Sequence, residues 1–301
     1  MTIKPFTQFG GVEVPDAGFE KARIIVLPLC YEHSPSYGAG SGAGPFHILE
    51  ASAQLERMEE ETLIDWGLLK IHTLPPMTPC GLPEQAVADM KTAAEKIMAK
   101  GKFLLSLGGD HAITIGPAIA ASRIYSNLGI IQVDAHMDLR DQWNGSRYNH
   151  ACVMRRIDEE AGIPMVQVGI RAFCAEELDY VRRRNLRPVY AHTIDPADNS
   201  WIQEAVERLP ENVYLSIDLD GLDPSVLPAT GTPEPGGLSF RQLISLIKAI
   251  GRGRRVVAAD INELAKIEGS QVSEYTAAKI ATKIFIHCAD REAVFQKRGN
   301  P

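Results

Sequence analysis

The sequence predicts an α/β fold with a mostly parallel sheet. Segments typical of strands alternate with segments typical of helices along the 301 residues, as they do in repeated β-α-β units. The strand segments are continuous apolar runs, such as Ile24 to Leu27, which indicates strands buried on both faces. Prominent acids and histidines follow the ends of such runs, where parallel sheets place their sites. A TIM barrel would share this arrangement, so these observations leave an open sheet and a barrel as alternatives.

The expected elements follow from local residue patterns, taken in chain order. Residues 22–29 form an apolar strand, and a loop rich in Gly, Ser and Pro leads to a helix at 46–60, where apolar residues recur at helical spacing. Pro83 and Gly101 are typical of the beginning and the end of a helix over 83–100. Further strands are expected at 103–107, 129–133, 164–170, 187–190, 213–217 and 255–261, and further helices at 114–125, 151–161, 175–184, 198–209, 239–251 and 272–289.

No linker, low-complexity tract or internal repeat interrupts this alternation. We therefore expect a single domain over residues 1–301, with residues 1–21 as an N-terminal extension. Five cysteines are scattered without a Cys-x-x-Cys pair, and the N-terminus lacks an apolar signal core. These features indicate free thiols in a cytoplasmic protein.

Composition and charge limit the classes of partner. The chain is 45% hydrophobic and 23% charged, which is ordinary for a globular protein. Its formal net charge of −7 argues against nucleic acid and anionic membranes as partners, and it is compatible with a small cationic substrate. Because no apolar run reaches the length of a membrane span, we expect no transmembrane helix.

Three ionisable residues follow one apolar run at every second position. Asp134, His136 and Asp138 come directly after the strand expected at 129–133. Alternate side chains of an extended chain point to the same side, so these three groups are expected to project together. Buried carboxylates without compensation are too costly, and a cation is the natural compensation.

Two other strand segments end in the same kind of residue. Asp218 and Asp220 follow the run at 213–217, and His111 follows the two glycines after 103–107. The combined set of four aspartates and two histidines offers oxygen and nitrogen donors without a thiolate, which suits manganese better than structural zinc. Six groups exceed what one ion usually takes from a protein, so two ions that share carboxylates fit better.

Several of these segments resemble a known family. Gly-Gly-Asp-His at 108–111, Asp-Ala-His-Met-Asp at 134–138 and Ser-Ile-Asp-Leu-Asp-Gly-Leu-Asp-Pro at 216–224 resemble the three metal-site signatures of the ureohydrolases, the arginase and agmatinase enzymes. Residues 229–238 match the loop after the third signature, and residues 34–52 resemble the substrate-side loop and first helix. The resemblance implies an open, doubly wound parallel sheet with helices on both faces, two Mn²⁺ ions per subunit, and a homotrimer or homohexamer.

The resemblance also implies a role for each matching residue. Asp138 would accept a hydrogen bond from the hydroxide that attacks the guanidinium carbon, His150 would carry a proton to the leaving amine, and Glu263 would hold the guanidinium. One metal would take His111, Asp134, Asp138 and Asp218, and the other would take Asp134, His136, Asp218 and Asp220.

The substrate is expected to be a decarboxylated guanidine compound. Arginases carry a segment that resembles Gly-x-Arg-Asp-x-Asp, whereas residues 169–174 read Gly-Ile-Arg-Ala-Phe-Cys and lack both acids. We therefore expect hydrolysis of agmatine to urea and putrescine, a step of polyamine biosynthesis. Aminopropylagmatine, guanidinobutyrate, guanidine and arginine are alternatives. Glu32 and Glu234 are candidate acids for a cationic tail.

Two other functions compete with this hypothesis. A metal-binding relative without turnover would keep the fold and would be free to lose His150 and Glu263, which are both present. A deacetylase of the same fold would use one zinc ion and would not need His111 or Asp138 as ligands. The complete set of residues favours the ureohydrolase.

Overall fold

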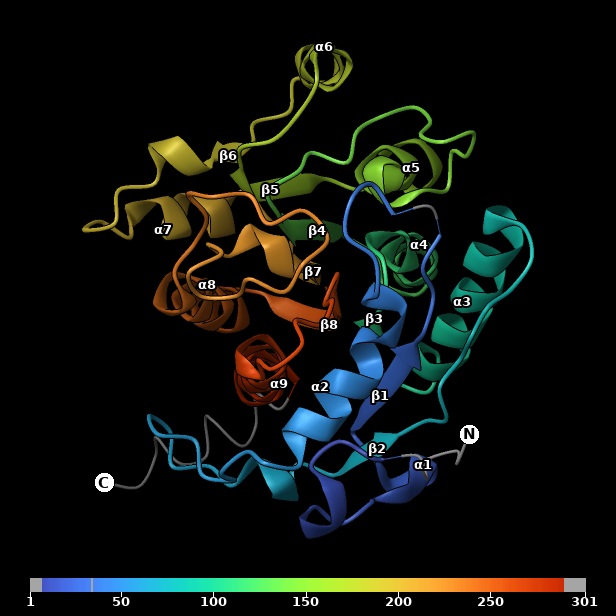
Figure 1. The fold of residues 1–301 in the computed structure, drawn as a ribbon, viewed down its shortest axis with the longest axis vertical. Helices are drawn as coiled ribbons and strands as arrows, with labels where there is room; N and C mark the ends of the chain where they lie inside the picture. The colour runs from blue at the N-terminus through green and yellow to red at the C-terminus, as the bar shows by residue number, and fades with distance from the viewer. Residues whose placement is uncertain (1–6, 34, 290–301) are drawn as a thin grey trace.

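The computed structural model describes residues 7–33 and 35–289, and it confirms the predicted α/β fold (Figure 1). Within these residues, eight strands form one sheet in the order β2-β1-β3-β8-β7-β4-β5-β6, and all pairings between them are parallel. Because β2 and β6 lie at opposite edges, the sheet is open and is not a barrel. The strands are β1 (Ile24–Leu29), β2 (Ile71–Thr73), β3 (Phe103–Gly108), β4 (Leu128–Val133), β5 (Met165–Ile170), β6 (Val189–Tyr190), β7 (Asn212–Asp218) and β8 (Arg255–Asn262).

Helices cover both faces of the sheet. Residues of α3, α4, α5 and α6 pack in the core on one face, and residues of α2, α7, α8 and α9 pack in the core on the other. Figure 1 shows α3, α4 and α5 on one side of the strands and α8 and α9 on the other. The helices are α1 (Gly18–Lys21), α2 (Gly44–Ser52), α3 (Pro83–Met98), α4 (Ile115–Ile124), α5 (Val153–Ala161), α6 (Ala175–Arg184), α7 (Ser200–Glu207), α8 (Phe240–Gly253) and α9 (Val272–Ile284).

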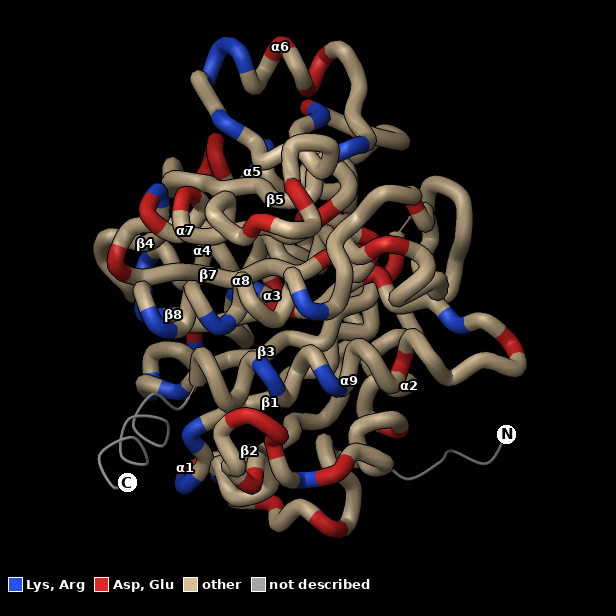
Figure 2. The backbone as a smooth tube through the Cα atoms, turned by 90° about the vertical axis from the view of Figure 1, so that its left-hand side faces the viewer, with Lys and Arg blue, Asp and Glu red and all other residues tan. Residues whose placement is uncertain are grey.

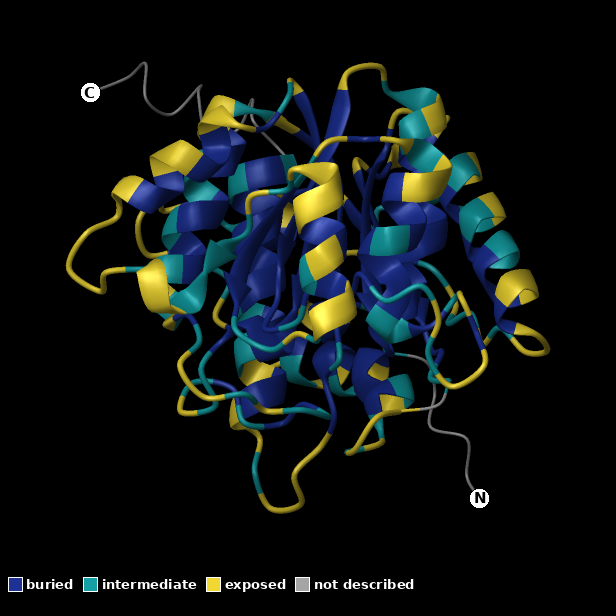
Figure 3. Cartoon of the chain, turned by 90° about the horizontal axis from the view of Figure 1, so that it is seen from above, coloured by how far each residue is buried: buried dark blue, intermediate teal, exposed yellow. Residues whose placement is uncertain are grey.

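The continuous apolar strands contribute side chains to the cores on both faces of the sheet. In β1, Ile24 and Val26 belong to one core, whereas Ile25 and Leu27 belong to the other. Successive side chains of a strand point to opposite faces, so a strand covered on both sides needs apolar residues at every position. Figure 3 shows the sheet buried between helices whose outward faces are exposed.

The helix expected at 46–60 is shorter in the structure. Helix α2 ends at Ser52, and the following segment folds back on itself. Met58 forms an antiparallel bridge with Asp65, and Arg57 Nε donates to Asp65 Oδ1 at 3.0 Å. Met58 is 52% exposed. The apolar spacing that predicted a helix up to residue 60 therefore did not mark the buried face of a helix at this position.

Two other elements differ from the prediction: one strand was missed, and one helix ends earlier than expected. Strand β2 (Ile71–Thr73) was missed because it has three residues and contains His72 at its centre. The closing helix expected at 272–289 divides into α9, which ends at Ile284, and a wider π-helical turn at Phe285–Ala289.

The strand order brings four strand ends together. The neighbours β3, β8, β7 and β4 are aligned so that Leu107 pairs with Ile261, Ile261 with Ile217, and Ile217 with Val133. The segments that follow these positions leave the sheet at the same level. Residues from distant parts of the sequence therefore meet at one edge of the sheet.

The outer surface is mixed in charge. Figure 2 shows Lys and Arg interspersed with Asp and Glu over the side of the backbone that it presents. Across the described part of the chain, no helix combines the length and apolar character that a membrane crossing requires.

Candidate active site

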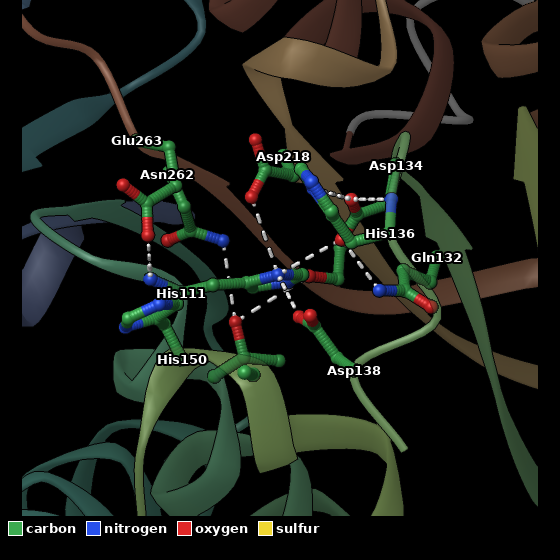
Figure 4. A network of polar contacts seen from close by, with 12 residues as sticks. His111, Gln132, Asp134, His136, Asp138, His150, Asp218, Asn262 and Glu263 are labelled. Atoms are coloured by element: carbon green, nitrogen blue, oxygen red, sulfur yellow. Dashed lines mark hydrogen bonds and ion pairs between the residues drawn. The ribbon is translucent and has the colours of Figure 1, made fainter. Parts of the chain in front are cut away.

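The six predicted metal ligands converge at the carboxyl ends of β3, β4 and β7. Figure 4 labels His111, Asp134, His136, Asp138 and Asp218 among them. His111 begins the 3-10 turn after β3, Asp218 is the last residue of β7, and Asp220 lies in the turn that follows β7. The remaining three ligands, Asp134, His136 and Asp138, follow β4.

The donor atoms form two overlapping groups. His111 Nδ1 lies 2.9 Å from Asp138 Oδ2, 3.1 Å from Asp134 Oδ2 and 3.4 Å from Asp218 Oδ2. His136 Nδ1 lies 3.0 Å from Asp220 Oδ2 and 3.5 Å from Asp134 Oδ1. Asp134 thus faces both histidines, one with each carboxylate oxygen. Two sets, His111 with Asp134 and Asp218, and His136 with Asp134 and Asp220, each have ligand atoms within 4.8 Å of one another.

The chemistry of these donors fits divalent cations. All four aspartates are exposed by 5% or less. Burial raises the pKa of Asp138 to about 7, and the charge of Asp134 adds to this effect. Burial likewise raises the pKa of Asp218 well above its usual range, with Asp220 and Asp134 contributing. A cation would relieve the repulsion among these carboxylates.

A buried nitrogen supports the same interpretation. His111 Nδ1 faces carboxylates but makes no hydrogen bond of good geometry among the described residues. An imidazole nitrogen is a common metal ligand, and a metal would satisfy this atom as well as the carboxylates.

Two glycines allow this convergence. A Cβ atom on Gly109 would lie 1.8 Å from the carbonyl oxygen of Tyr31, and one on Gly108 would lie 2.1 Å from Asn262 Oδ1. The end of β3 can therefore approach the loop after β1 and the end of β8 only with glycine at both positions. This explains the Gly-Gly pair before His111.

Two site residues adopt left-handed backbone conformations that are rare for side chains other than glycine. Asp138 has φ 53° and Glu263 has φ 65°. The backbone of Asp138 is held because its carbonyl accepts from the amides of Met154 at 3.0 Å and Arg155 at 3.2 Å. Such strained residues concentrate at functional sites.

Further polar residues hold the aspartates, and the sequence analysis did not identify them. Gln132 Nε2 donates to Asp134 Oδ2 at 2.6 Å, and Gln167 Nε2 donates to Gln132 Oε1 at 2.6 Å. Thr232 Oγ1 donates to Asp220 Oδ2 at 3.2 Å. The available signal was Gln132 itself, because it is a polar residue in an otherwise apolar strand, on the same side as Asp134.

A cavity of about 200 Å³ lies over the converged ligands. Its floor includes five of the six ligands, while Asp134 is fully buried beneath it. Residues 35–38 of the glycine-rich loop form part of the wall, together with Arg140 and Trp143. The Arg140 guanidinium lies over the Trp143 ring, 4.3 Å from its centroid.

His150 and Glu263 both line this cavity. His150 Nε2 lies 2.8 Å from Ser36 Oγ, and burial together with the positive charges of His111 and His136 lowers the pKa of His150 to about 4. Glu263 Oε1 accepts from the amide of His111 at 2.7 Å. Burial raises the pKa of Glu263 well above its usual range, and the charge of Asp110 contributes.

Glu32 and Glu234, the two candidate acids for a cationic tail, do not line this cavity. Glu32 Oε1 accepts from the amides of Gly40 at 2.7 Å and Ser41 at 3.2 Å, so it organises the glycine-rich loop. A different acid, Glu177, lines an adjoining cavity with Arg140, Ala172 and Phe173. Glu177 lies at the first turn of α6, where its sequence position suggested only a helix start.

Comparisons with known proteins agree with this geometry. The sequence profile of the arginase family matches residues 22–287. N(1)-aminopropylagmatine ureohydrolase of Synechocystis sp. is 38% identical over 88% of this chain and 89% of its own length. Agmatinase of Pyrococcus horikoshii is 32% identical over 89% of this chain and 93% of its own.

A solved structure gives the same result. The agmatine ureohydrolase of Thermoplasma volcanium superposes with a TM-score of 0.87 and 29% identity over 98% of this chain and 97% of its own. The predicted resemblance is thereby confirmed. The chain belongs to the arginase family and is an agmatinase-like ureohydrolase, a hydrolase that acts on linear amidine C–N bonds.

Proposed function

We propose that this ureohydrolase binds two Mn²⁺ ions and hydrolyses the guanidinium group of a decarboxylated guanidino amine, with N(1)-aminopropylagmatine preferred and agmatine second. The observation that carries the proposal is the convergence of four aspartates and two histidines in two overlapping groups beneath a cavity. The products would be urea and the corresponding amine, which is putrescine when agmatine is the substrate.

The metal ligands are assigned by the two groups of donors. Oxygen and nitrogen donors without thiolate suit manganese. When bound, the ions would neutralise the carboxylates and lower the pKa of water, so that hydroxide is available near neutral pH. One ion would be held by His111, Asp134, Asp138 and Asp218, and the other by Asp134, His136, Asp218 and Asp220.

Glu263 would position the substrate. Its carboxylate lines the cavity next to the ligands, and it can accept paired hydrogen bonds from the planar guanidinium. The amide of His111 holds one of its oxygens, which fixes the carboxylate relative to the floor. The guanidinium carbon would thus lie over the ligands, where Asp138 can accept a hydrogen bond from the attacking hydroxide.

His150 would return a proton to the leaving amine. Ionisation of the attacking water releases one proton, and cleavage of the C–N bond leaves an amine that takes up one proton. With its low pKa, His150 is neutral at pH 7 and can receive this proton before passing it on. Ser36, which is exposed, lies 2.8 Å from Nε2 and connects His150 to the solvent side.

The space for the substrate tail favours a long amine. The adjoining cavity of about 200 Å³ shares His136, Asp138, Arg140 and Ala151 with the first one, so the two form a longer path. Phe173, 44% exposed, offers apolar contact for methylene groups. Relatives of 38 to 39% identity that are named for N(1)-aminopropylagmatine support this choice.

The test is urea release from the manganese-loaded protein with N(1)-aminopropylagmatine, agmatine and arginine side by side. We expect kcat/KM to be highest for N(1)-aminopropylagmatine, lower for agmatine and lowest for arginine. Equal rates with agmatine would overturn the preference for the long tail. Release from arginine alone would overturn the argument from residues 169–174, and no release from any guanidine compound would favour a metal-binding relative without turnover.

Assembly and location are further parts of the proposal. By its family, the chain is proposed to form a homotrimer or homohexamer in the cytoplasm. A light-scattering mass of one chain at full activity would contradict the assembly.

A further inference from the structure

We infer that Asp260 is a positioning residue which, through the hydroxyl of Ser216, fixes the imidazole of His111 with its proton on Nε2 and its Nδ1 free to bind metal. The inference rests on the proposed metal centre and concerns residues that do not contact the metal or the substrate. It explains why the Asp260 carboxylate and the hydroxyls of Thr114, Tyr214 and Ser216 form a buried cluster next to the ligand His111.

The carboxylate of Asp260 is fully buried in β8 and receives four hydrogen bonds. Ser216 Oγ donates to Oδ1 at 2.7 Å, and Asn262 Nδ2 donates to the same oxygen at 2.6 Å. Thr114 Oγ1 donates to Oδ2 at 2.9 Å, and the Tyr214 hydroxyl donates to Oδ2 at 2.7 Å. An ionised carboxylate only accepts hydrogen bonds, and this one has two donors on each oxygen.

The sheet register places these groups. Ser216 of β7 is paired directly with Asp260 of β8. Tyr214, Ser216 and Asp218 alternate along β7, so the hydroxyls lie on the side of the strand that carries the ligand Asp218. Figure 4 shows the ligand His111 between Asn262 and Glu263 on one side and the aspartates on the other.

A count of protons then fixes the tautomer of His111. A serine hydroxyl has one hydrogen, and Ser216 gives it to Asp260. Its oxygen, 2.9 Å from His111 Nε2, can therefore only accept, so Nε2 must carry a proton. In the metal-loaded protein the neutral imidazole then directs the lone pair of Nδ1 at the space between the aspartates.

The hydrogen bond between Ser216 and His111 also fixes the orientation of the His111 imidazole ring. His111 is 1% exposed, and its Nε2 contact with Ser216 comes from a residue two positions before the ligand Asp218. A hydrogen-bonded partner of this kind on the far nitrogen of a ligating histidine commonly sets its tautomer, and loss of the partner typically costs 10- to 100-fold in metal affinity.

The test is the Asp260→Leu variant. Leucine has nearly the size of aspartate but accepts no hydrogen bond, whereas asparagine could still turn its amide oxygen toward Ser216 and Asn262. In Asp260→Leu the Ser216 hydrogen loses its acceptor and can point at His111 Nε2, which places the imidazole proton on Nδ1. We expect a 10- to 100-fold loss of Mn²⁺ affinity at the site that contains His111 and unchanged affinity at the site that contains His136.

The measurement is a Mn²⁺ titration by calorimetry with chelator competition, together with electron paramagnetic resonance at limiting metal. The variant should show the spectrum of a single Mn²⁺ ion where the parent protein shows a coupled pair. Ser216→Ala should shift the affinity in the same direction, and it carries the test if Asp260→Leu does not fold. Tyr214→Phe is the matched control, since it removes a hydrogen bond to Asp260 and leaves Ser216 in place.

The Tyr214→Phe control distinguishes a role of Asp260 in positioning His111 from a general role in stabilising the buried cluster. Near-normal affinity in Tyr214→Phe with selective loss in Asp260→Leu supports the inference. Equal losses in both variants, or two ions bound at parental affinity in Asp260→Leu, overturn it while the proposed function stands. Urea release and metal content of the parent protein are measured in parallel, and a parent protein that binds no Mn²⁺ overturns both proposals.

Discussion

At the scale of single residues, the site combines buried acids with histidines of different character. Asp138 lies in the cavity floor and Asp134 is buried beneath it, both near His111, whereas His150 lines the cavity and contacts Ser36. Because the pKa of His150 is lowered to about 4, its imidazole is neutral over the whole range from pH 6 to 8. Its proposed task is proton transfer, and it is not expected to contribute to metal binding.

Replacement of His150 by Asn should separate these tasks. We expect kcat to fall by about 10²- to 10⁴-fold, which is the usual contribution of a general acid or base, with two Mn²⁺ ions still bound. Steady-state urea release and metal content measured on the same sample check this. The matched control is His192→Asn at an exposed position, and an unchanged kcat in His150→Asn would remove His150 from the mechanism.

The buried carboxyls predict how metal binding depends on pH. In the metal-free protein the pKa of Asp138 is raised to about 7 and that of Asp218 is raised as well. Below the pKa of a carboxyl group the metal must displace its proton. Because the pKa of Asp138 is about 7, Mn²⁺ affinity should fall as pH decreases through 7, by about tenfold per pH unit for each proton displaced.

The stability of the metal-free protein should change with pH in the opposite direction to the Mn²⁺ affinity. A carboxyl whose folded pKa lies above its unfolded pKa stabilises the metal-free fold at low pH, and this contribution is lost as pH rises through 7. The increase in Tm on adding Mn²⁺ should therefore be larger at pH 8 than at pH 6. Thermal unfolding with and without Mn²⁺ at pH 6 and pH 8 is the check. If the increase in Tm on adding Mn²⁺ were the same at both pH values, Mn²⁺ would not be displacing protons from these carboxyl groups.

At the scale of elements, local patterns predicted most helices and strands, and contacts between distant segments decided the rest. The apolar run of β1 and the helix signals around α3 have direct local causes. The early end of α2 at Ser52 does not, and the segment after it folds back so that Arg57 pairs with Asp65. The three-residue strand β2 exists through its partner β1, so its own residues could not predict it.

The glycine pair after β3 offers a prediction at this scale. Gly109→Ala should destabilise the protein by about 1–3 kcal/mol or more, because its Cβ would lie 1.8 Å from the Tyr31 carbonyl and displace the end of β3. Denaturant unfolding measures the loss, and weaker Mn²⁺ binding should accompany it because His111 follows directly.

The control for this variant is Gly269→Ala. Gly269 has φ 79° and nothing within 4 Å of an added Cβ, so the substitution carries a backbone cost of about 1 kcal/mol and should leave Mn²⁺ binding intact. If Gly109→Ala were no more harmful than Gly269→Ala, close approach of backbone would not be the reason for the glycine pair.

At the scale of the whole molecule, the strand order assembles the site. The residues after β3, β4 and β7 meet because these strands and β8 are neighbours. Alternation after β4 was enough to predict that the side chains of Asp134, His136 and Asp138 lie together. The sequence did not indicate that Asp260 lies below His111, since their link passes through Ser216 and depends on the register of β7 and β8. The contact between His150 and Ser36 likewise spans 114 positions.

The most direct test of the central claim is the position of manganese in crystals of the Mn²⁺-loaded protein, located by anomalous diffraction at the manganese edge. The account predicts two peaks per chain, one between His111 and Asp138 and one between His136 and Asp220, with Asp134 and Asp218 touching both. A single peak, a peak that His111 does not touch, or no peak at this edge of the sheet would contradict it.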